Sequence, residues 1–378
     1  MKIGVTFGTR DHSETAHNTG ILQNSVNLVT CLNHIHETWL VQTCFPMDNN
    51  KKYEFNIYDY PVVGIDEIFR DEKLFGFDMM IILGGELVDS DLESLQNRGV
   101  KVVYYNCGAM YQLHVMDVIF GKTKDEKYWR TRYQNYDGVW CIPQNWKRNE
   151  YYQRVLFRQD EIPDVPFLYD PTFIDKGLHA IDSNFQKAVY KPNRSVGKRL
   201  SIMESNRDWL KNYVQPLLIS ESVYRKKPEL ISQISINNFD GFKDVNLDTL
   251  LETMDVWMSN NTISYVNGWF PVYEYLETYT DIVVSHQRDN ELSYYPLDIL
   301  YLEYPLVHNY GLIRDAGYYY EDWNFDQAEE KLEEALRFHD TNLDIYNHRA
   351  KKVLDRYSPF NGDNIDKYSK LIKQYIGE

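Results

Sequence analysis

The sequence predicts an α/β protein made of two Rossmann-like domains, with parallel sheets facing a central cleft. Three observations lead to this class. The chain has 378 residues, more than one ordinary hydrophobic core accommodates. Short apolar segments alternate with amphipathic segments, as they do in βαβ units. Several apolar segments end in glycine or polar residues, which is typical of parallel strands that lead into a binding crevice.

The first half supplies one series of these elements. A helix with the expected apolar stripe follows the first strand, and another follows the third. We expect strands at 3–7, 40–44, 78–83, 100–105 and 138–142, and helices at 21–32 and 89–97.

The second half repeats the alternation after a proline-rich connection at 163–175. We expect strands at 200–203, 230–236, 262–266, 282–285 and 305–307, and helices at 329–338, 344–355 and 363–376. The predicted boundaries are an N-terminal domain at 1–170, a connection at 171–195, and a second domain at 196–358. The helix at 359–378 is expected to pack back on the N-terminal domain.

Charge and cysteine content narrow the classes of function. The formal net charge of −16 argues against an extended surface for polyanions, because phosphate contacts require clustered lysine and arginine. The four cysteines show no CxxC pair and no zinc spacing. A first strand at the N-terminus and the lack of a long apolar run predict no signal peptide and no membrane partner. We therefore expect a cytoplasmic protein, a monomer or weak dimer.

The loop after the first strand is the first candidate site. His12, Glu14 and His17 precede Asn18, and Gly20 opens the following helix. Glycine lets a bound group approach the backbone, and a helix N-terminus offers free N–H donors. A plain strand–helix connection explains the glycine equally well, but three ionisable residues in one loop favour a binding role.

Two more strand ends of the first half carry glycine. Gly84-Gly85-Glu86 and Asn106-Cys107-Gly108 leave room for a ligand or are simply tight turns. Asp89-Ser90-Asp91 spells the D-x-D pattern of metal-dependent sugar transferases. Because it lies where a helix begins, we interpret Asp89 as a helix cap rather than a metal ligand.

In the second half, Asn206 ends a strand segment, and Arg207 and Lys211 follow it. An amide and basic side chains at a strand end suit a diphosphate, which needs charge-assisted donors. The alternative is a capped helix with solvated charges.

The stretch 282–309 is the most informative part of the chain. A buried strand leads to His286, and Asn290 and Asp298 follow eight residues apart, a spacing that places both on one edge of a helix. A second apolar strand ends at His308 and Asn309. A carboxylate at such a crevice accepts both hydroxyls of a ribose, and His286 is positioned to contact a phosphate or the transferred group.

Sequence blocks over most of the chain resemble a bacterial and phage family long catalogued as a domain of unknown function, which is similar to GT-B glycosyltransferases. The blocks are S-H-Q-x-x-N (285–290), Y-x-x-x-D (Tyr294 to Asp298), Y-P-L-V-H-N (304–309), R-D-A-G-Y-Y-Y (314–320), N-x-G-x-x-Q-N (18–24), C-G-x-x-Y (107–111), P-x-L-x-x-P-x-F-x-D (166–175) and E-x-N-x-x-x-x-K (204–211).

The resemblance implies a nucleotide sugar, UDP-linked by expectation, as co-substrate, with no tightly bound cofactor and no metal. It also implies that the domain at 196–358 binds this nucleotide sugar and that the domain at 1–170 is on the acceptor side. Asp298 would bind ribose, Lys211 and Arg207 the diphosphate, and His286 the sugar. Asn290 and Asp298 occupy the positions of the two glutamates in the E-x7-E donor signature of GT-B enzymes. Met116 occupies the position of a single glutamate that the family has shortly after C-G-x-x-Y. The remaining assignments follow the same resemblance. The base candidates are His12, Glu14, His17, Glu86 and Asp117, and the donor-binding set further includes Asn18, Gly20, Asn206, Asn290, Tyr294, His308 and Asn309.

The acceptor expectation also rests on resemblance. The Tyr-, Asn- and Asp-rich composition and compact size are similar to T-even phage proteins, which include transferases that glycosylate 5-hydroxymethylcytosine in DNA. A hexose or a pentose such as arabinose would be transferred to that DNA partner. The alternatives are a glycan or lipid-linked acceptor, and an inactive nucleotide-sugar-binding protein. A Rossmann oxidoreductase is disfavoured because no G-x-G-x-x-G follows the first strand.

Overall fold

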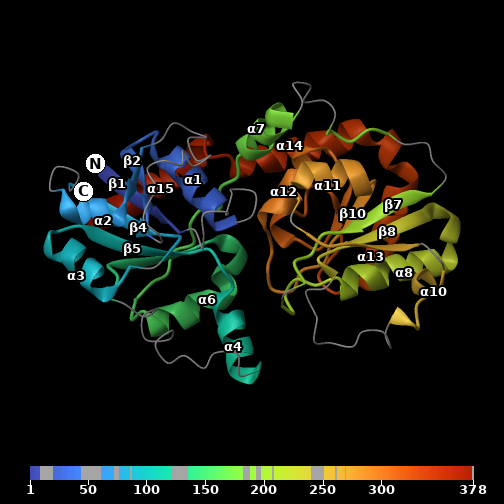
Figure 1. Ribbon diagram of the computed structural model, residues 1–378, viewed down its shortest axis with the longest axis horizontal. Coiled ribbons are helices and arrows are strands. Elements are labelled where there is room, and N and C mark those ends of the chain that lie inside the picture. The colour runs from blue at the N-terminus through green and yellow to red at the C-terminus, as the bar shows by residue number, and fades with distance from the viewer. Residues whose placement is uncertain are drawn as a thin grey trace. The chain divides into compact units, whose positions relative to one another are not determined.

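The chain forms two compact units in the computed structural model, which describes residues 1–8, 20–43, 61–71, 76–85, 87–120, 135–181, 188–192, 197–206, 208–239, 251–259, 262–268 and 270–376. Met1–Asp170 and Tyr357–Glu378 make up the first unit, and Pro171–Arg356 makes up the second (Figure 1). The C-terminal segment therefore belongs to the same unit as the N-terminus.

The first unit contains a six-stranded parallel sheet in the order β3-β2-β1-β4-β5-β6. Its strands are nearly continuous apolar runs, because helices cover both faces of a parallel sheet. The strands are β1 (Lys2–Phe7), β2 (Glu37–Gln42), β3 (Val62–Gly64), β4 (Met79–Ile82), β5 (Lys101–Asn106) and β6 (Gly138–Cys141).

Helices of the first unit include one from the far end of the chain. The described helices are α1 (Gly20–Leu32), α2 (Ile65–Arg70), α3 (Asp89–Asn97), α4 (Met110–Phe120), α6 (Pro143–Leu156) and α15 (Gly362–Ile376). α15 joins the buried core here: the Trp140 indole donates to the Tyr375 hydroxyl at 3.2 Å, and the hydroxyls of Tyr105 and Tyr368 lie 3.1 Å apart. Tyr368 also donates to the Pro166 carbonyl at 2.7 Å.

The second unit repeats this topology with a sheet in the order β12-β11-β10-β7-β8-β9, again all parallel. Counted from the start of the unit, its strands lie in the order 3-2-1-4-5-6, as in dinucleotide-binding domains. They are β7 (Lys198–Ile202), β8 (Ile231–Asn237), β9 (Ile263–Val266), β10 (Ile282–Val284), β11 (Leu306–His308) and β12 (Tyr318–Tyr319).

Helices cover both faces of this second sheet, with α8 and α13 on one side and α11 and α12 on the other (Figure 1). None of the described helices is long and apolar enough to span a membrane. The helices are α7 (Thr172–Ile181), α8 (Val214–Lys226), α10 (Asp255–Met258), α11 (Val272–Tyr279), α12 (Tyr294–Tyr301), α13 (Phe325–Phe338) and α14 (Leu343–Tyr357), with the 3₁₀ turns η3 (Pro228–Leu230), η5 (Gly311–Ile313) and η6 (His339–Thr341).

The predicted α/β class with two Rossmann-like halves is confirmed, although the short edge strands β3 and β12 were not predicted. Three-residue and two-residue strands carry too little periodicity to be recognised from sequence. The interpretation of Asp89 as the helix cap was wrong. Val88 is the N-cap residue of α3, while Asp89 and Asp91 lie in its first turn, where carboxylates favour the positive end of the helix dipole.

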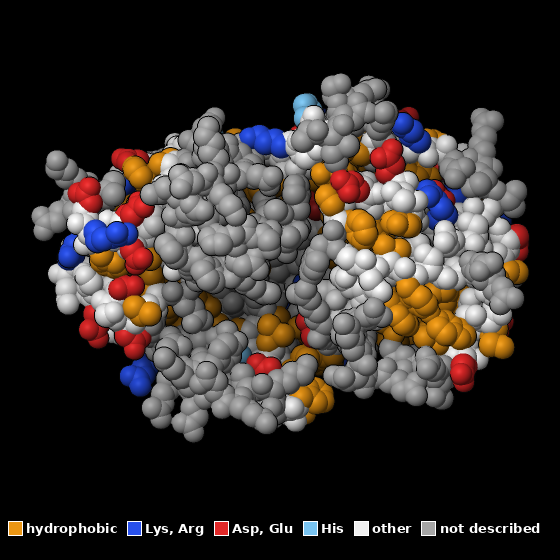
Figure 2. Space-filling model, viewed as in Figure 1, with side chains coloured by type: hydrophobic (Ala, Val, Ile, Leu, Met, Phe, Trp, Pro, Cys, Tyr) orange, Lys and Arg blue, Asp and Glu red, His pale blue; other side chains and the backbone are white. Residues whose placement is uncertain are grey.

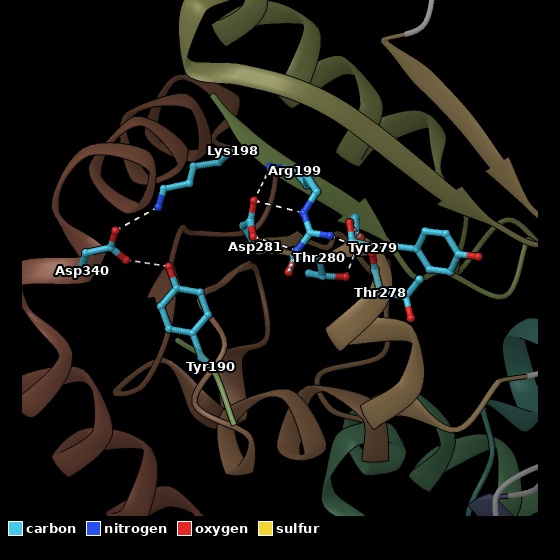
Figure 3. Close-up of polar contacts among 9 residues, drawn as sticks. Tyr190, Lys198, Arg199, Thr278, Tyr279, Thr280, Asp281 and Asp340 are labelled. Carbon is cyan, nitrogen blue, oxygen red and sulfur yellow. Dashed lines mark hydrogen bonds and ion pairs between the residues drawn. The ribbon is translucent and has the colours of Figure 1, made fainter. Parts of the chain in front are cut away.

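Polar contacts at the amino ends of β7 and β10 fix the register of the two central strands (Figure 3). The Arg199 guanidinium donates to both carboxylate oxygens of Asp281, at 3.0 and 3.3 Å, and to the Thr278 carbonyl at 2.7 Å. The Arg199 amide also donates to Asp281, at 2.8 Å. Lys198 forms an ion pair with Asp340 at 2.9 Å, and Tyr190 donates to the same carboxylate.

We expect Arg199→Ala to lower the free energy of unfolding of the second unit by about 2 kcal/mol, because the almost fully buried carboxylate of Asp281 loses its charged partner. Urea unfolding with hydrogen exchange of the β7 amides measures the effect. Arg337→Ala is the control, because its helical pair with Glu333 is solvent-exposed and contributes at most about 0.5 kcal/mol. Equal losses in the two variants would contradict the prediction.

Candidate functional site

The candidate site lies at the carboxyl ends of β7 and β10 in the second unit. These strands are neighbours in the sheet, and the chain order reverses between them, with β8 and β9 on one side and β11 and β12 on the other. Ligands of open α/β sheets bind outside the carboxyl ends of the strands at such a reversal, because loops leave in opposite directions and open a crevice.

A buried carboxylate lies at this point. Glu204, just after β7, is fully inaccessible to solvent. One of its oxygens accepts from the hydroxyls of Ser285 and Tyr295, the latter at 2.6 Å, and the other accepts from the Gln287 amide at 2.8 Å. The hydroxyl of Tyr310 lies 2.7 Å from both Ser285 and Tyr295. We call Glu204, Ser285, Gln287, Tyr295 and Tyr310 the Glu204 network.

Burial raises the pKa of Glu204, while the donors from Ser285, Tyr295 and Gln287 and the charge of Lys211 oppose that rise. Burial also raises the pKa of Tyr295 and Tyr310 far above the ordinary tyrosine range. Both hydroxyls therefore keep their protons and act as donors. The network joins β7, the loop after β10, α12 and the segment after β11 in one hydrogen-bonded group.

Gln287 connects this network to the neighbouring strand end. Its backbone amide donates to the Asn309 side chain at 2.9 Å, and the Asn309 amide donates back to the Gln287 carbonyl at 2.9 Å. The side chain of Asn290 donates to the Gln287 side-chain oxygen. Asn290 and Asn309, both predicted donor-binding residues, therefore hold the loop after β10 in position.

Lys211 lies on the other loop of the crevice, after β7, and pairs with Gln287 in an isolated bridge. Its side chain is half-buried. Burial lowers the pKa of Lys211, and the carboxylates of Glu204 and Asp208 oppose the decrease. Within the described part of the chain, its ammonium group makes no ion pair or hydrogen bond. A half-buried charge in this state is suited to an anionic ligand.

His286 is buried in an aromatic enclosure. The Tyr320 hydroxyl donates to the Ser285 carbonyl at 3.0 Å, so its oxygen accepts from Nδ1–H of His286, also at 3.0 Å. Burial lowers the pKa of His286 to about 4. The neutral ring therefore presents a bare acceptor at Nε2. That atom is buried and finds no partner among the described residues. The centroid of the His286 ring lies 4.6 Å from that of Trp323 and 5.6 Å from that of Phe325.

Two other predicted donor-binding residues use their polar atoms within the protein. His308 accepts from the Tyr310 amide at Nδ1 and donates from Nε2 to the Ala316 carbonyl, at 3.1 and 2.9 Å. A side chain at Gly317 would come within 2.6 Å of that ring, and its φ of +67° also favours glycine. The Asn206 side chain donates to the Asn237 carbonyl and accepts from the Tyr213 amide.

The helix after this loop begins at Tyr294 and contains a largely buried Asp298. Asn290 therefore lies in the loop and not on an edge of the helix with Asp298, as the spacing had suggested. Ser293 and Pro296 explain the late start: Ser293 has an extended backbone as the N-cap, and a proline is tolerated in the first turn.

The candidates of the first unit are only partly described. His12, Glu14, His17, Asn18 and Glu86 lie outside the described residues, as does Arg207 of the second unit. Gly20 is the first residue of α1, and Asp117 is half-buried in the second half of α4.

Gly84, at the reversal between β1 and β4, packs closely on the neighbouring strand end. A Cβ there would lie 2.8 Å from the Ile21 side chain and 3.1 Å from the Phe7 Cα. This close approach of the α1 side chain and the end of β1 requires glycine at position 84, a reason that the sequence analysis did not consider.

The members of the Glu204 network were not singled out from the sequence. Glu204 was noted only within a motif, and Tyr295, Tyr310 and Gln287 were not proposed. A carboxylate directly after the apolar segment 200–203 was the available signal for Glu204, because such a residue at a strand end is seldom explained by packing. No group of three or more His, Cys, Asp or Glu side chains that could hold a metal forms within the described ranges.

Comparison with known protein families identifies the family of this chain. A family model described as "Protein of unknown function (DUF2827)" matches residues 3–372. The chain belongs to the DUF2827 family. A search of curated proteins finds no significant match.

Solved structures similar to this DUF2827 protein span its whole length. A glycosyltransferase from Rickettsia africae matches with a TM-score of 0.54 at 11% identity, covering 99% of this chain and 98% of that chain. An E. coli trehalose-6-phosphate structure bound with UDP-2-fluoro glucose matches with a TM-score of 0.55 at 12% identity, covering 99% of each chain. Anabaena HepE in complex with UDP and glucose matches at 0.55 and 9%, covering 99% and 100%. The chain thus has the predicted GT-B fold.

Proposed function

We propose that this DUF2827 protein is a nucleotide-sugar-dependent glycosyltransferase whose donor binds at the carboxyl ends of β7 and β10. The observation that carries the proposal is the half-buried ammonium of Lys211, which has no ionic partner among the described residues and lies beside the Glu204 network. A diphosphate supplies the missing negative charge. Structures of similar fold contain UDP, or UDP-2-fluoro glucose, which supports a UDP-linked donor.

Each chemical group of the nucleotide-sugar donor is assigned to a different described residue. Lys211 would bind the diphosphate, Asp298 would accept from the two ribose hydroxyls, and the bare Nε2 of His286 would accept from a sugar hydroxyl. In the reaction the acceptor oxygen bonds to the anomeric carbon as the bond from that carbon to the diphosphate breaks. The electron pair remains on the leaving diphosphate, and a base, predicted in the first unit, takes the acceptor proton.

We expect Asp298→Ala to bind UDP about 10- to 100-fold more weakly than the wild type, since two charge-assisted hydrogen bonds to ribose are lost. Calorimetric titration with UDP and with 2′,3′-dideoxy-UDP measures this. The wild type should prefer UDP, and the variant should bind both ligands alike. Asp344→Ala, at an exposed position on α14, is the control. Retention of the preference for UDP in Asp298→Ala would refute the ribose assignment.

Transfer itself is tested by incubation with a panel of nucleotide sugars and candidate acceptors. The acceptor that we propose, on the resemblance described in the sequence analysis, is 5-hydroxymethylcytosine in phage DNA. Mass spectrometry of digested nucleosides detects its glycosylation. On the face shown in Figure 2, the described basic side chains lie among acidic ones rather than in one extended patch, so the described residues of this face offer local contacts to DNA phosphates and not an extended surface. Transfer only to glycan or lipid-linked acceptors would reject the DNA acceptor, and tight binding without transfer would indicate an inactive binding protein.

A further inference from the structure

Arg288 lies on the loop after β10, directly beside the loop after β7. Its backbone amide donates to the Leu210 carbonyl at 2.9 Å, next to Lys211. The residue therefore lies beside Lys211 and the Glu204 network, in the loop that the sequence analysis had already marked as a candidate site, although Arg288 itself was not singled out.

The guanidinium of Arg288 lies against two indole rings. Its central carbon lies 4.4 Å from the ring centroid of Trp209 and 4.5 Å from that of Trp323. Both indoles remain partly exposed, at 40% and 38%. A cation–π contact attracts the guanidinium by its charge and does not use its N–H donors, which remain available to an oxygen acceptor.

Those donors are unused within the described part of the chain, where the Arg288 side chain makes no hydrogen bond or ion pair. Two neighbouring groups are in a comparable state. The ammonium of Lys211 lacks an ionic partner there, and Nε2 of the buried His286, whose ring packs on Trp323, lacks a hydrogen-bond partner. In a chain with a formal net charge of −16, two cations on adjacent loops that form no ion pair within the described residues indicate an anionic ligand.

We propose that Arg288 binds the diphosphate of the nucleotide donor together with Lys211, an inference that rests on the proposed function. A guanidinium edge presents two parallel N–H groups that match two phosphate oxygens. When the bond from the anomeric carbon to the diphosphate oxygen breaks, the electron pair moves to that oxygen, and the two cations stabilise the charge that develops on it. Trp209 and Trp323 fix the orientation of the guanidinium before the ligand arrives, which reduces the entropy lost on binding.

Titration of Arg288→Gln with UDP, inorganic pyrophosphate and uridine tests this proposal. We expect about 10- to 100-fold weaker binding of UDP and pyrophosphate, and little change for uridine, which lacks the diphosphate. Arg288→Lys retains the charge but not the planar edge, so its loss should be intermediate. Arg349→Gln, at an exposed position on α14, changes the net charge equally and should bind as the wild type does. Thermal unfolding of each variant identifies any loss due to misfolding.

A double-mutant cycle with Lys211→Met then asks whether the two cations act on one anion. Shared contacts predict a combined loss of affinity that differs from the product of the single losses, whereas independent sites predict a simple product. Unchanged UDP and pyrophosphate affinity in folded Arg288→Gln would overturn the inference while leaving the proposed function intact. Pyrophosphate binding that depends on Arg288, in a protein that transfers no sugar, would support the anion site and reject the transferase. A wild type that binds neither ligand would overturn both.

Discussion

Replacing Glu204 by glutamine is expected to lower the free energy of unfolding of the second unit by about 3 kcal/mol. The carboxylate accepts from three donors, Ser285, Tyr295 and Gln287. A glutamine of the same shape presents an N–H₂ group to some of these donors, so buried hydrogen-bonding groups lose their partners. Because the Glu204 network holds the loop after β10 in position, the Glu204→Gln variant should also have a lower affinity for UDP.

Urea unfolding gives the change in stability, and hydrogen exchange of the amides at 285–290 reports on the loop. Tyr295→Phe removes a single donor and should cost about 1 kcal/mol. Glu330→Gln, at an exposed position on α13, should change stability by less than about 0.5 kcal/mol. If Glu204→Gln matches the wild type in stability and in UDP affinity, the network does not organise the site.

The second unit should lose stability steeply as the pH falls from 6.5 to about 4. His286, His308 and His339 are buried, and burial lowers the pKa of each to about 4. The unfolded chain binds protons at these positions below pH ~6.5, whereas the folded chain does not. The stability from keeping the rings neutral is therefore complete above pH 6.5 and is lost toward pH 4, by about 2 kcal/mol per histidine at pH 5.

Unfolding midpoints measured between pH 7.5 and 4.5 test this dependence. The raised pKa of Glu204 acts in the opposite direction, because protonation at low pH relieves its burial, so unfolding of Glu204→Gln at each pH separates the two effects. Selectively labelled histidine followed by NMR gives the direct measurement, with the exposed ring of His348 as the reference signal. Protonation of the three buried rings in the folded protein near pH 6.5 would contradict the explanation.

Apolar strands and their polar ends were readable from the sequence because they depend on local pattern. The segment 282–285 and the turn after it were predicted as a strand leading into a binding loop, and β10 runs from Ile282 to Val284. Spacing alone was less reliable where a loop intervened. The eight residues from Asn290 to Asp298 include a loop as far as Ser293, so helical periodicity did not apply.

Pairing between distant residues was beyond the sequence. Glu204 and Ser285 are 81 positions apart and meet because β7 pairs with β10, and nothing local in either segment encodes that neighbourhood. The same holds for Trp209, Arg288 and Trp323, which come from loops after three different strands. A histidine such as His308 looks like a site residue in sequence, while its environment shows that both ring nitrogens serve the protein itself.

By itself, the sequence determined the α/β class, the two successive Rossmann-like halves and the loop after β10 as a candidate site. These follow from the alternation of apolar and amphipathic segments, which is set by how each residue partitions between water and core. Only the tertiary structure decided the strand order, the Glu204 network and the contacts of Arg288 with two indole rings. Parallel strands pair across long sequence separations, so the side chains that share a crevice are chosen by topology.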